Sequence, residues 1–273
     1  MSTNWITIDD LELQEYKVRK ETENFYGKNR SGFCDCALDG VELLWQGISY
    51  LRNVDKTDIS KDWDNFNIAI RSLSWFHYYR ITFTFKSIYN LALSGYYTES
   101  AILLRHVLET LIRHRYIFRS KNIELVNLAF AGHYGYKGRK FPVKYKVMFD
   151  DITPGLYKEY QLLCDFAHGA GLSTILKTNI TDNKSKNISL DGGVVFKPCE
   201  VTYILNQYTV YLLAHLELMM WIWPEIKSNM PEKYSCKYEK LLSLLWKIMD
   251  SFEKTGKTKI WYKKVHNLIT IKE

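Results

Sequence analysis

The stretch Tyr96–Ser120, YYTESAILLRHVLETLIRHRYIFRS, decides the fold class because it carries the signals of an amphipathic helix along its whole length. Its apolar residues recur at three- and four-residue steps, at Leu104, Val107, Leu108, Leu111 and Ile112. Thr98 is expected to cap the helix, and Glu99 puts an acid in the first turn, where the helix dipole favours one. We therefore predict a helix that buries one side against the rest of the protein.

A charged ladder runs beside the apolar stripe of this predicted helix, at Arg105, Glu109 and Arg113. Side chains four residues apart meet on a helix, so Glu109 is expected to pair with Arg105. One interpretation is an ion pair that orders two neighbouring helices. The other is a polar site in which Glu109 holds Arg105 while Arg113 or His106 faces an anion. We expect the Arg105–Glu109 pair to be largely buried, because the segments on both sides of this helix are also apolar.

Helical spacing continues on both sides of this stretch. Further helices are predicted at about 8–27, 34–52, 63–94, 153–168, 199–222 and 235–253. Gly95 stands where a left-handed helix end is expected, so the helices before and after it should pack antiparallel as a hairpin. Thr153 and Pro154 are the expected cap and first residue of their helix. Asp191–Gly193 predicts a small β-hairpin near 188–196.

These patterns predict an all-α multi-helix bundle of about seven or eight helices, with at most one small β-hairpin. Hydrophobic residues make up 47% of the chain and charged residues 25%, which is typical of a globular protein and excludes disorder. We expect a single helical domain over 1–273. It divides into N-terminal helices in 1–62, a helical core in 63–223, and a C-terminal helix with a basic tail in 224–273.

Neither a metal nor a cofactor is expected. The five cysteines are an odd number, and only Cys34 and Cys36 lie close together, which predicts reduced thiols rather than disulfides or a zinc site. The N-terminus lacks the basic flank and apolar run of a signal peptide. The most apolar stretch, Val201–Trp223, is interrupted by polar residues. We therefore expect a cytoplasmic protein with no membrane partner.

A basic segment at His133–Lys146 is the strongest indication of an acidic partner. The chain carries 37 Lys and Arg against 30 Asp and Glu, a net charge of +7, which permits RNA as a partner. The positive residues of the segment are Lys137, Arg139, Lys140, Lys144 and Lys146. Lysines hold phosphates, and the tyrosines between them can stack on unpaired bases. The alternative interpretation is a solvated loop.

The sequence Leu163-Cys-Asp-Phe-Ala-His168-Gly169 places a histidine near the end of a predicted helix. Asp165 precedes His168 by three residues and shares its helix face. A carboxylate there orients the imidazole, which suits general acid–base chemistry. The alternative is a histidine that caps its helix by binding the last carbonyl groups.

The order LALSGYYTESAILLRHVLETLIRHRYI, followed further along by LCDFAHGAG, resembles an uncharacterised family of bacterial helical proteins. Members of that family show an Arg-x-x-x-Glu helix and a later helix that ends in His-Gly or His-Pro. The family is similar to the HEPN superfamily (higher eukaryotes and prokaryotes nucleotide-binding), whose members are helical bundles. Many HEPN proteins are metal-independent ribonucleases or nucleotide-binding partners in toxin and phage-defence systems. The resemblance covers about Ser74–Gly171 and implies a HEPN-like core.

The chain departs from the HEPN pattern in one respect. Active HEPN ribonucleases carry an arginine shortly before the histidine, whereas Tyr160–Cys164 contains none, so only His168 carries over. Arg71 and His77 match that spacing on a different helix, which we interpret as coincidence.

Two functions are therefore expected. One is a metal-independent RNA-cleaving or RNA-binding component of a bacterial toxin or defence system. In this function His168 transfers a proton and Asp165 orients His168. Arg105, which Glu109 holds, or Arg113 stabilises the phosphorane. The other is a non-catalytic helical protein that regulates by binding a nucleotide or a protein, which the missing arginine favours. RNA or a nucleotide is the expected partner, and a homodimer the expected assembly.

Overall fold

The computed structural model describes residues 8–29, 33–54, 64–133, 141–167, 194, 196–253 and 258–270. Within these ranges the chain forms eleven helices and no strand, which confirms the all-α prediction. The helices are α1 (Ile8–Asn29), α2 (Phe33–Val54), α3 (Phe66–Leu93), α4 (Tyr97–Ser120), α5 (Ile123–His133), α6 (Tyr145–Ile152), α7 (Leu156–Ala167), α9 (Pro198–Ile222), α10 (Pro224–Ser228), α11 (Glu232–Glu253) and α12 (Thr258–Ile269).

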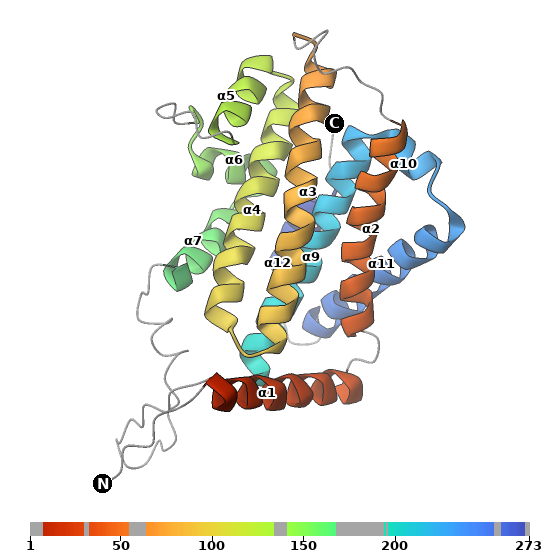
Figure 1. Ribbon diagram of the computed structural model, residues 1–273. Helices are drawn as coiled ribbons and strands as arrows, with labels where there is room; N and C mark the ends of the chain where they lie inside the picture. Colours follow the sequence, from red (N-terminus) through yellow and green to blue (C-terminus); the bar gives the residue numbers. More distant parts are fainter. Residues whose placement is uncertain are drawn as a thin grey trace.

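Three long helices, α3, α4 and α9, form the centre of the bundle and pack against one another. Helices α6 and α7 cover α4 on one side, whereas α2, α10 and α11 cover α9 on the other (Figure 1). Helix α1 lies across the end of the bundle where α3 turns into α4. None of the described helices combines the length with the apolar character that a membrane-spanning segment needs.

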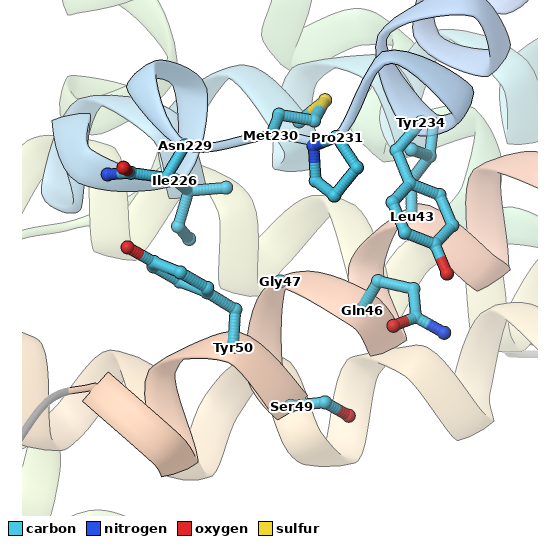
Figure 2. Close-up of a pocket in the computed structure, with 10 residues that line it drawn as sticks. All are labelled: Leu43, Gln46, Gly47, Ser49, Tyr50, Ile226, Asn229, Met230, Pro231 and Tyr234. Carbon is cyan, nitrogen blue, oxygen red and sulfur yellow. The ribbon is translucent and has the colours of Figure 1, made fainter.

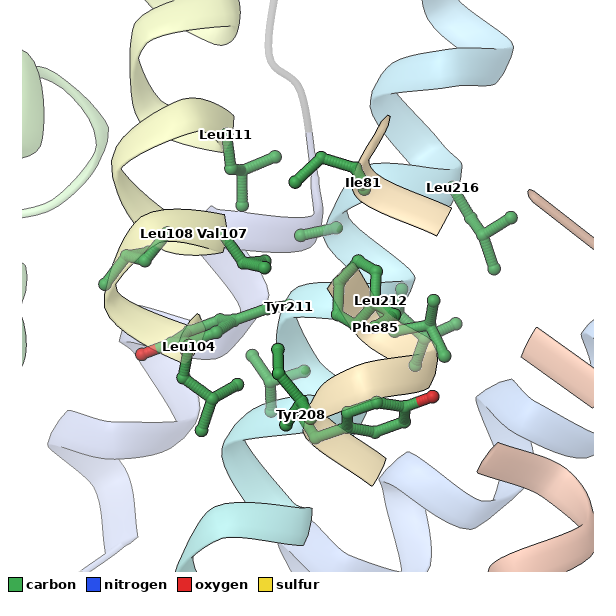
Figure 3. Packing of buried hydrophobic residues seen from close by; sticks show 14 of the residues in the cluster. Ile81, Phe85, Leu104, Val107, Leu108, Leu111, Tyr208, Tyr211, Leu212 and Leu216 are labelled. Atoms are coloured by element: carbon green, nitrogen blue, oxygen red, sulfur yellow. The ribbon is translucent and has the colours of Figure 1, made fainter. Parts of the chain in front are cut away.

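The apolar faces of α3, α4 and α9 meet in one continuous core. Phe85 from α3, Leu108 from α4 and Leu212 from α9 are fully buried members of this core, part of which is shown in Figure 3. Burying a side chain of this size contributes about 1.5–3 kcal/mol. The buried hydroxyl of Tyr208 also finds a partner, since it donates to the carbonyl of Ala37, 3.1 Å away. Helix α9 is buried almost all round because neighbours surround it.

Gly95 ends α3 as the sequence predicts, with a left-handed φ of 89°. The amide of Tyr96 bonds the carbonyl of Leu91, 2.9 Å away, and closes the last turn of α3. The expected cap at Thr98 is wrong, because Tyr96 occupies the cap position and α4 begins at Tyr97. Thr98 is instead buried in the first turn. The two helices form the predicted hairpin, and the turn is so short that no room remains for a cap at Thr98.

The predicted start of the helix at Thr153 is also wrong. Residues 145–152 form α6, and Thr153 ends it by donating its amide to the carbonyl of Phe149, 3.1 Å away. Gly155, with a φ of 82°, then turns the chain, and α7 begins at Leu156. A threonine followed by a proline is a common helix start. Here α6 extends to Ile152, so Thr153 ends α6, and the next helix begins only at Leu156.

The basic tail predicted at the C-terminus is wrong over 258–269, where α12 packs against α9 and α11. Val265 and Leu268 are buried, so the tail carries its own apolar face. This helix, together with the short helices α5, α6 and α10, explains why the count exceeds the expected seven or eight. Residues 188–193 and 195 of the predicted β-hairpin lie outside the described part of the chain.

Candidate functional site

Polar and aromatic side chains gather where α6 and α7 pack against α4. Arg105, Glu109 and Arg113 from α4 meet Tyr145 from α6 and Tyr160 from α7. We call these five residues the α4–α6–α7 face. Helix α4 brings its three charged residues to one side because they are four positions apart.

The predicted pairing of Arg105 with Glu109 is confirmed. Nε of Arg105 lies 2.9 Å from Oε1 of Glu109. The expectation that the pair is largely buried holds in part: most of each side chain is covered, but 26% and 17% of their surface stays exposed. Burial lowers the pKa of Arg105, but the hydrogen bond and charge of Glu109 outweigh burial and raise that pKa overall. Arg105 thus remains charged at the contact between α4 and α7, where the pair keeps contact with solvent.

Tyr160 joins this pair from α7. Its hydroxyl donates to the same Oε1 of Glu109, 2.7 Å away, and its ring lies 5.8 Å from the guanidinium carbon of Arg105. Burial raises the pKa of Tyr160, and the Glu109 carboxylate raises it further, so the hydroxyl stays protonated at neutral pH and remains a donor. Glu109 therefore accepts two hydrogen bonds from two different helices.

The side chain of Arg113 contacts α6 rather than the Arg105–Glu109 pair. Its Nη2 donates to the hydroxyl of Tyr145, and its guanidinium lies over the rings of Phe141 and Tyr145 at 5.5 and 5.6 Å. Burial raises the pKa of Tyr145, while the positive charge of Arg113 acts in the opposite direction. The Nε of Arg113 is buried and has no hydrogen-bond partner among the residues that the structure describes. Arg113 is thus positioned mainly by aromatic surfaces, with one donor unused.

Aromatic rings from α6 and α7 support both arginines. The ring of Tyr160 lies 5.6 Å from Tyr145, 5.1 Å from Phe149 and 5.6 Å from Tyr157. Cation–π contacts contribute about 0.5–1 kcal/mol each at exposed sites. The result is a layer of packed rings with two guanidinium groups along its margin. Planar cations and aromatic rings are the groups that proteins use to stack on unpaired bases.

The other predicted site residues are only partly placed. Asp165 is exposed on α7. Its neighbour Cys164 lies close enough to Arg105 to contribute to the raised pKa of Arg105. Lys144 is exposed at the start of α6, and Lys146 pairs with Asp150 one turn later. Four of the predicted residues lie outside the described ranges: Lys137, Arg139, Lys140 and His168. His168 is the next residue after Ala167, the last residue of α7.

Arg71 and His77, whose spacing matches the ribonuclease pattern, point to different surroundings. Arg71 pairs with Glu225 of α10, 3.1 Å away. His77 is buried in the core, where its ring stacks on His114 at 4.1 Å and lies 5.4 Å from His215. These imidazoles come from α3, α4 and α9. Within the described ranges, no three His, Cys, Asp or Glu residues are arranged to hold a metal ion.

From the sequence, one tyrosine of the face, Tyr145, is among the residues expected to stack on bases, but Tyr160 has no predicted role. Tyr145 was interpreted only as part of the basic segment, and Tyr160 only as the beginning of a stretch without arginine. The sequence does contain a pattern that indicates the packed side of α7, because Tyr157, Tyr160 and Cys164 recur there at helical spacing. That spacing indicates a packed face, but it does not identify Glu109 as the partner.

No protein-family model, curated protein or solved structure matches this chain. Function is therefore inferred from the side chains of the α4–α6–α7 face and from the chemistry that they permit.

Proposed function

We propose that the α4–α6–α7 face binds single-stranded RNA. The observation that carries this proposal is the position of Arg105 and Arg113, whose guanidinium groups lie on tyrosine rings at a face that solvent still reaches. Arginine contacts phosphates with two parallel hydrogen bonds, and tyrosine stacks on unpaired bases. An arginine beside a tyrosine therefore provides both the phosphate contact and the base stacking that single-stranded RNA offers.

Arg113 is the residue best suited to the phosphate. Its side chain is only half-buried, and its guanidinium lies against Tyr145, the residue after Lys144, at the start of α6. Arg105 is already neutralised by Glu109, so it contributes less net attraction. We therefore assign phosphate contact to Arg113 with help from Lys144. Base stacking is assigned to Tyr145, which is only half-buried, whereas the buried Tyr160 supports Arg105 from below.

The test is binding of a short fluorescein-labelled single-stranded RNA, followed by anisotropy at several salt concentrations. Arg113→Gln is expected to weaken binding about tenfold, which corresponds to about 1.4 kcal/mol. Lys144→Ala should reduce the slope of log K against log salt by roughly 0.7, since each phosphate contact with a single strand releases about that many counterions. Arg80→Gln, an exposed arginine on α3, is the matched control. Equal binding by Arg113→Gln and Arg80→Gln contradicts the proposal.

Cleavage of the bound RNA is the second candidate function. The observation in its favour is that α7 packs Tyr160 and Cys164 against Arg105 and ends one residue before His168. In this proposal His168 transfers the proton and Arg105 stabilises charge on the phosphorus, with no metal ion required. Cleavage should persist in EDTA and be lost in His168→Ala while RNA binding is retained. His266→Ala, an exposed histidine on α12, is the control.

The alternative is a non-catalytic protein in which the face only joins helices. Arg113 donates to Tyr145 of α6 and Tyr160 of α7 donates to Glu109, so these contacts already join three helices, which favours this alternative. Absence of RNA binding at low salt, combined with lower thermal stability of Arg113→Gln, would support it.

A further inference from the structure

A cavity of about 240 Å³ lies between the middle of α2 and the turn that joins α10 to α11 (Figure 2). It is on the opposite side of the bundle from the α4–α6–α7 face (Figure 1). The cavity therefore belongs to a different surface from the one proposed to bind RNA.

The cavity is bounded by α2 with a core residue beneath it on one side and by the chain that follows α10 on the other. Gly47 of α2 has no side chain, and a Cβ at this position would lie 2.5 Å from Cε of Met219 on α9. Met219 therefore occupies the space beneath Gly47. Helix α10 is only five residues long and ends before Asn229, so the chain that continues through Pro231 arches over α2. Helix α2, with Met219 beneath it, thus forms one wall of the cavity, and the chain between α10 and α11 forms the opposite wall.

The cavity lining is uncharged. Leu43, Ile226 and Met230 supply apolar surface. The polar groups are amides and hydroxyls, and the described residues that line the cavity include no Lys, Arg, Asp, Glu or His. A charged ligand would lose its hydration there without gaining a counter-charge, so the cavity favours a neutral ligand.

The polar groups define what the ligand must offer. Asn229 donates its amide nitrogen to the carbonyl of Glu225, 2.8 Å away, which leaves its amide oxygen as an acceptor. The side-chain amide of Gln46 makes no hydrogen bond with another described residue. The rings of Tyr50 and Tyr234 stand at two ends of the cavity and provide flat apolar surfaces. A flat ring that carries an N–H or O–H group satisfies both requirements.

We infer that this cavity binds a small uncharged aromatic compound with a hydrogen-bond donor, of about the size of indole or phenol. Pockets for drug-sized ligands measure about 300–1,000 Å³, so a cavity of about 240 Å³ suits a smaller molecule. This ligand class follows from the lining itself and is independent of the proposed RNA binding.

The experiment uses the full chain and three probes observed by saturation-transfer NMR. Indole is expected to bind saturably, with a dissociation constant on the order of 0.1–1 mM for a ligand of so few atoms. The analogue 1-methylindole lacks the N–H donor and should bind roughly threefold to tenfold more weakly. Indole-3-acetate carries a carboxylate and should bind at least about tenfold more weakly. Absence of saturable indole binding overturns the inference.

Substitutions locate the bound indole. Gln46→Phe is expected to fill the cavity and abolish binding, whereas Gln14→Phe, a half-buried position on α1, should leave it unchanged. Asn229→Leu, at an exposed position that tolerates substitution, should abolish the preference for indole over 1-methylindole. Indole binding that survives in a folded Gln46→Phe overturns the inference. Displacement of indole by RNA would place indole on the α4–α6–α7 face and would also overturn it.

Discussion

Tyr160 on α7 donates its hydroxyl to the Glu109 carboxylate on α4, and the oxygen that accepts it also accepts from Arg105. This relationship ties α7 to α4 through a charged group that remains partly exposed. Hydrogen bonds to charged groups contribute more than neutral ones, about 1.5–3 kcal/mol. The same contact holds the Tyr160 ring beneath Arg105, so stability and the proposed RNA binding depend on a shared hydrogen bond.

Loss of this hydroxyl should destabilise the protein without removing the ring. Tyr160→Phe is expected to lower the free energy of unfolding by about 1–2 kcal/mol, because Glu109 loses one of its two donors. Urea unfolding of Tyr160→Phe, Glu109→Gln and the double variant measures the coupling between them. Tyr157→Phe is the matched control, since its ring contacts Tyr160 but its hydroxyl makes no hydrogen bond with a described residue. Strictly additive effects would show that the contact contributes nothing.

Arg115 should be required for docking of α12. It is buried, and its guanidinium donates to the carbonyl of Leu268 and, at 2.7 Å, to that of Thr270. Burial lowers the pKa of Arg115 to about 10, which leaves it charged at neutral pH. Arg115→Met is expected to cost about 2–4 kcal/mol and to speed hydrogen exchange in 258–270.

Arg119→Met is the control for Arg115→Met. Arg119 pairs with Asp151 on the surface, where each side chain is 37% exposed, so its loss should cost less than about 1 kcal/mol. If both variants exchange alike in 258–270, α12 does not depend on Arg115.

His215 should make stability depend on pH. Burial beside the rings of Tyr78 and Phe85 lowers the pKa of His215 to about 3, from an ordinary value of 6.5. Between these two pH values the unfolded chain binds a proton that the folded protein does not, so stability falls as pH falls below about 6.5. The expected contribution is about 1.4 kcal/mol per pH unit. Urea unfolding at pH 7, 6 and 5 measures it.

His215→Phe should flatten this acid dependence by that amount, even if the variant is less stable at pH 7. His266→Phe, on the exposed side of α12, should leave the dependence as it is in the parent protein. A parent and a His215→Phe variant with parallel pH profiles would show that His215 takes up a proton in the folded state as readily as in the unfolded state.

Two helical glycines should respond to alanine in opposite directions. A Cβ at Gly40 of α2 would collide with Leu212 of α9 and approach Leu241 of α11, so Gly40→Ala is expected to cost about 1–3 kcal/mol by overpacking. A Cβ at Gly27 of α1 meets nothing within 4 Å, so Gly27→Ala should stabilise by up to about 1 kcal/mol. Thermal melts of the two variants measure both. A stabilising Gly40→Ala would mean that α2 can move away from α9.

The position of each long helix could be predicted from the sequence, because a helix is encoded by residues that lie within a few positions of one another. The α3–α4 hairpin followed from Gly95 for the same reason. The boundaries that failed, at Thr98, Thr153 and the C-terminal tail, depend on neighbouring segments. Thr153 could not cap α7 because α6 already ended there, and the tail folded because Leu268 found a buried position.

The sequence by itself determined the helices, the Arg105–Glu109 pair and the stripe that α4 buries, since spacing alone brings those groups together. Only the tertiary structure decided what faces that stripe. The spacing also allows Arg113 to pair with Glu109. Instead, the guanidinium of Arg113 donates to Tyr145 of α6, and Glu109 accepts a hydrogen bond from Tyr160 of α7. Packing of α6 and α7 selects these partners through burial and ring contacts. That selection depends on groups distant in the chain, which periodicity cannot encode.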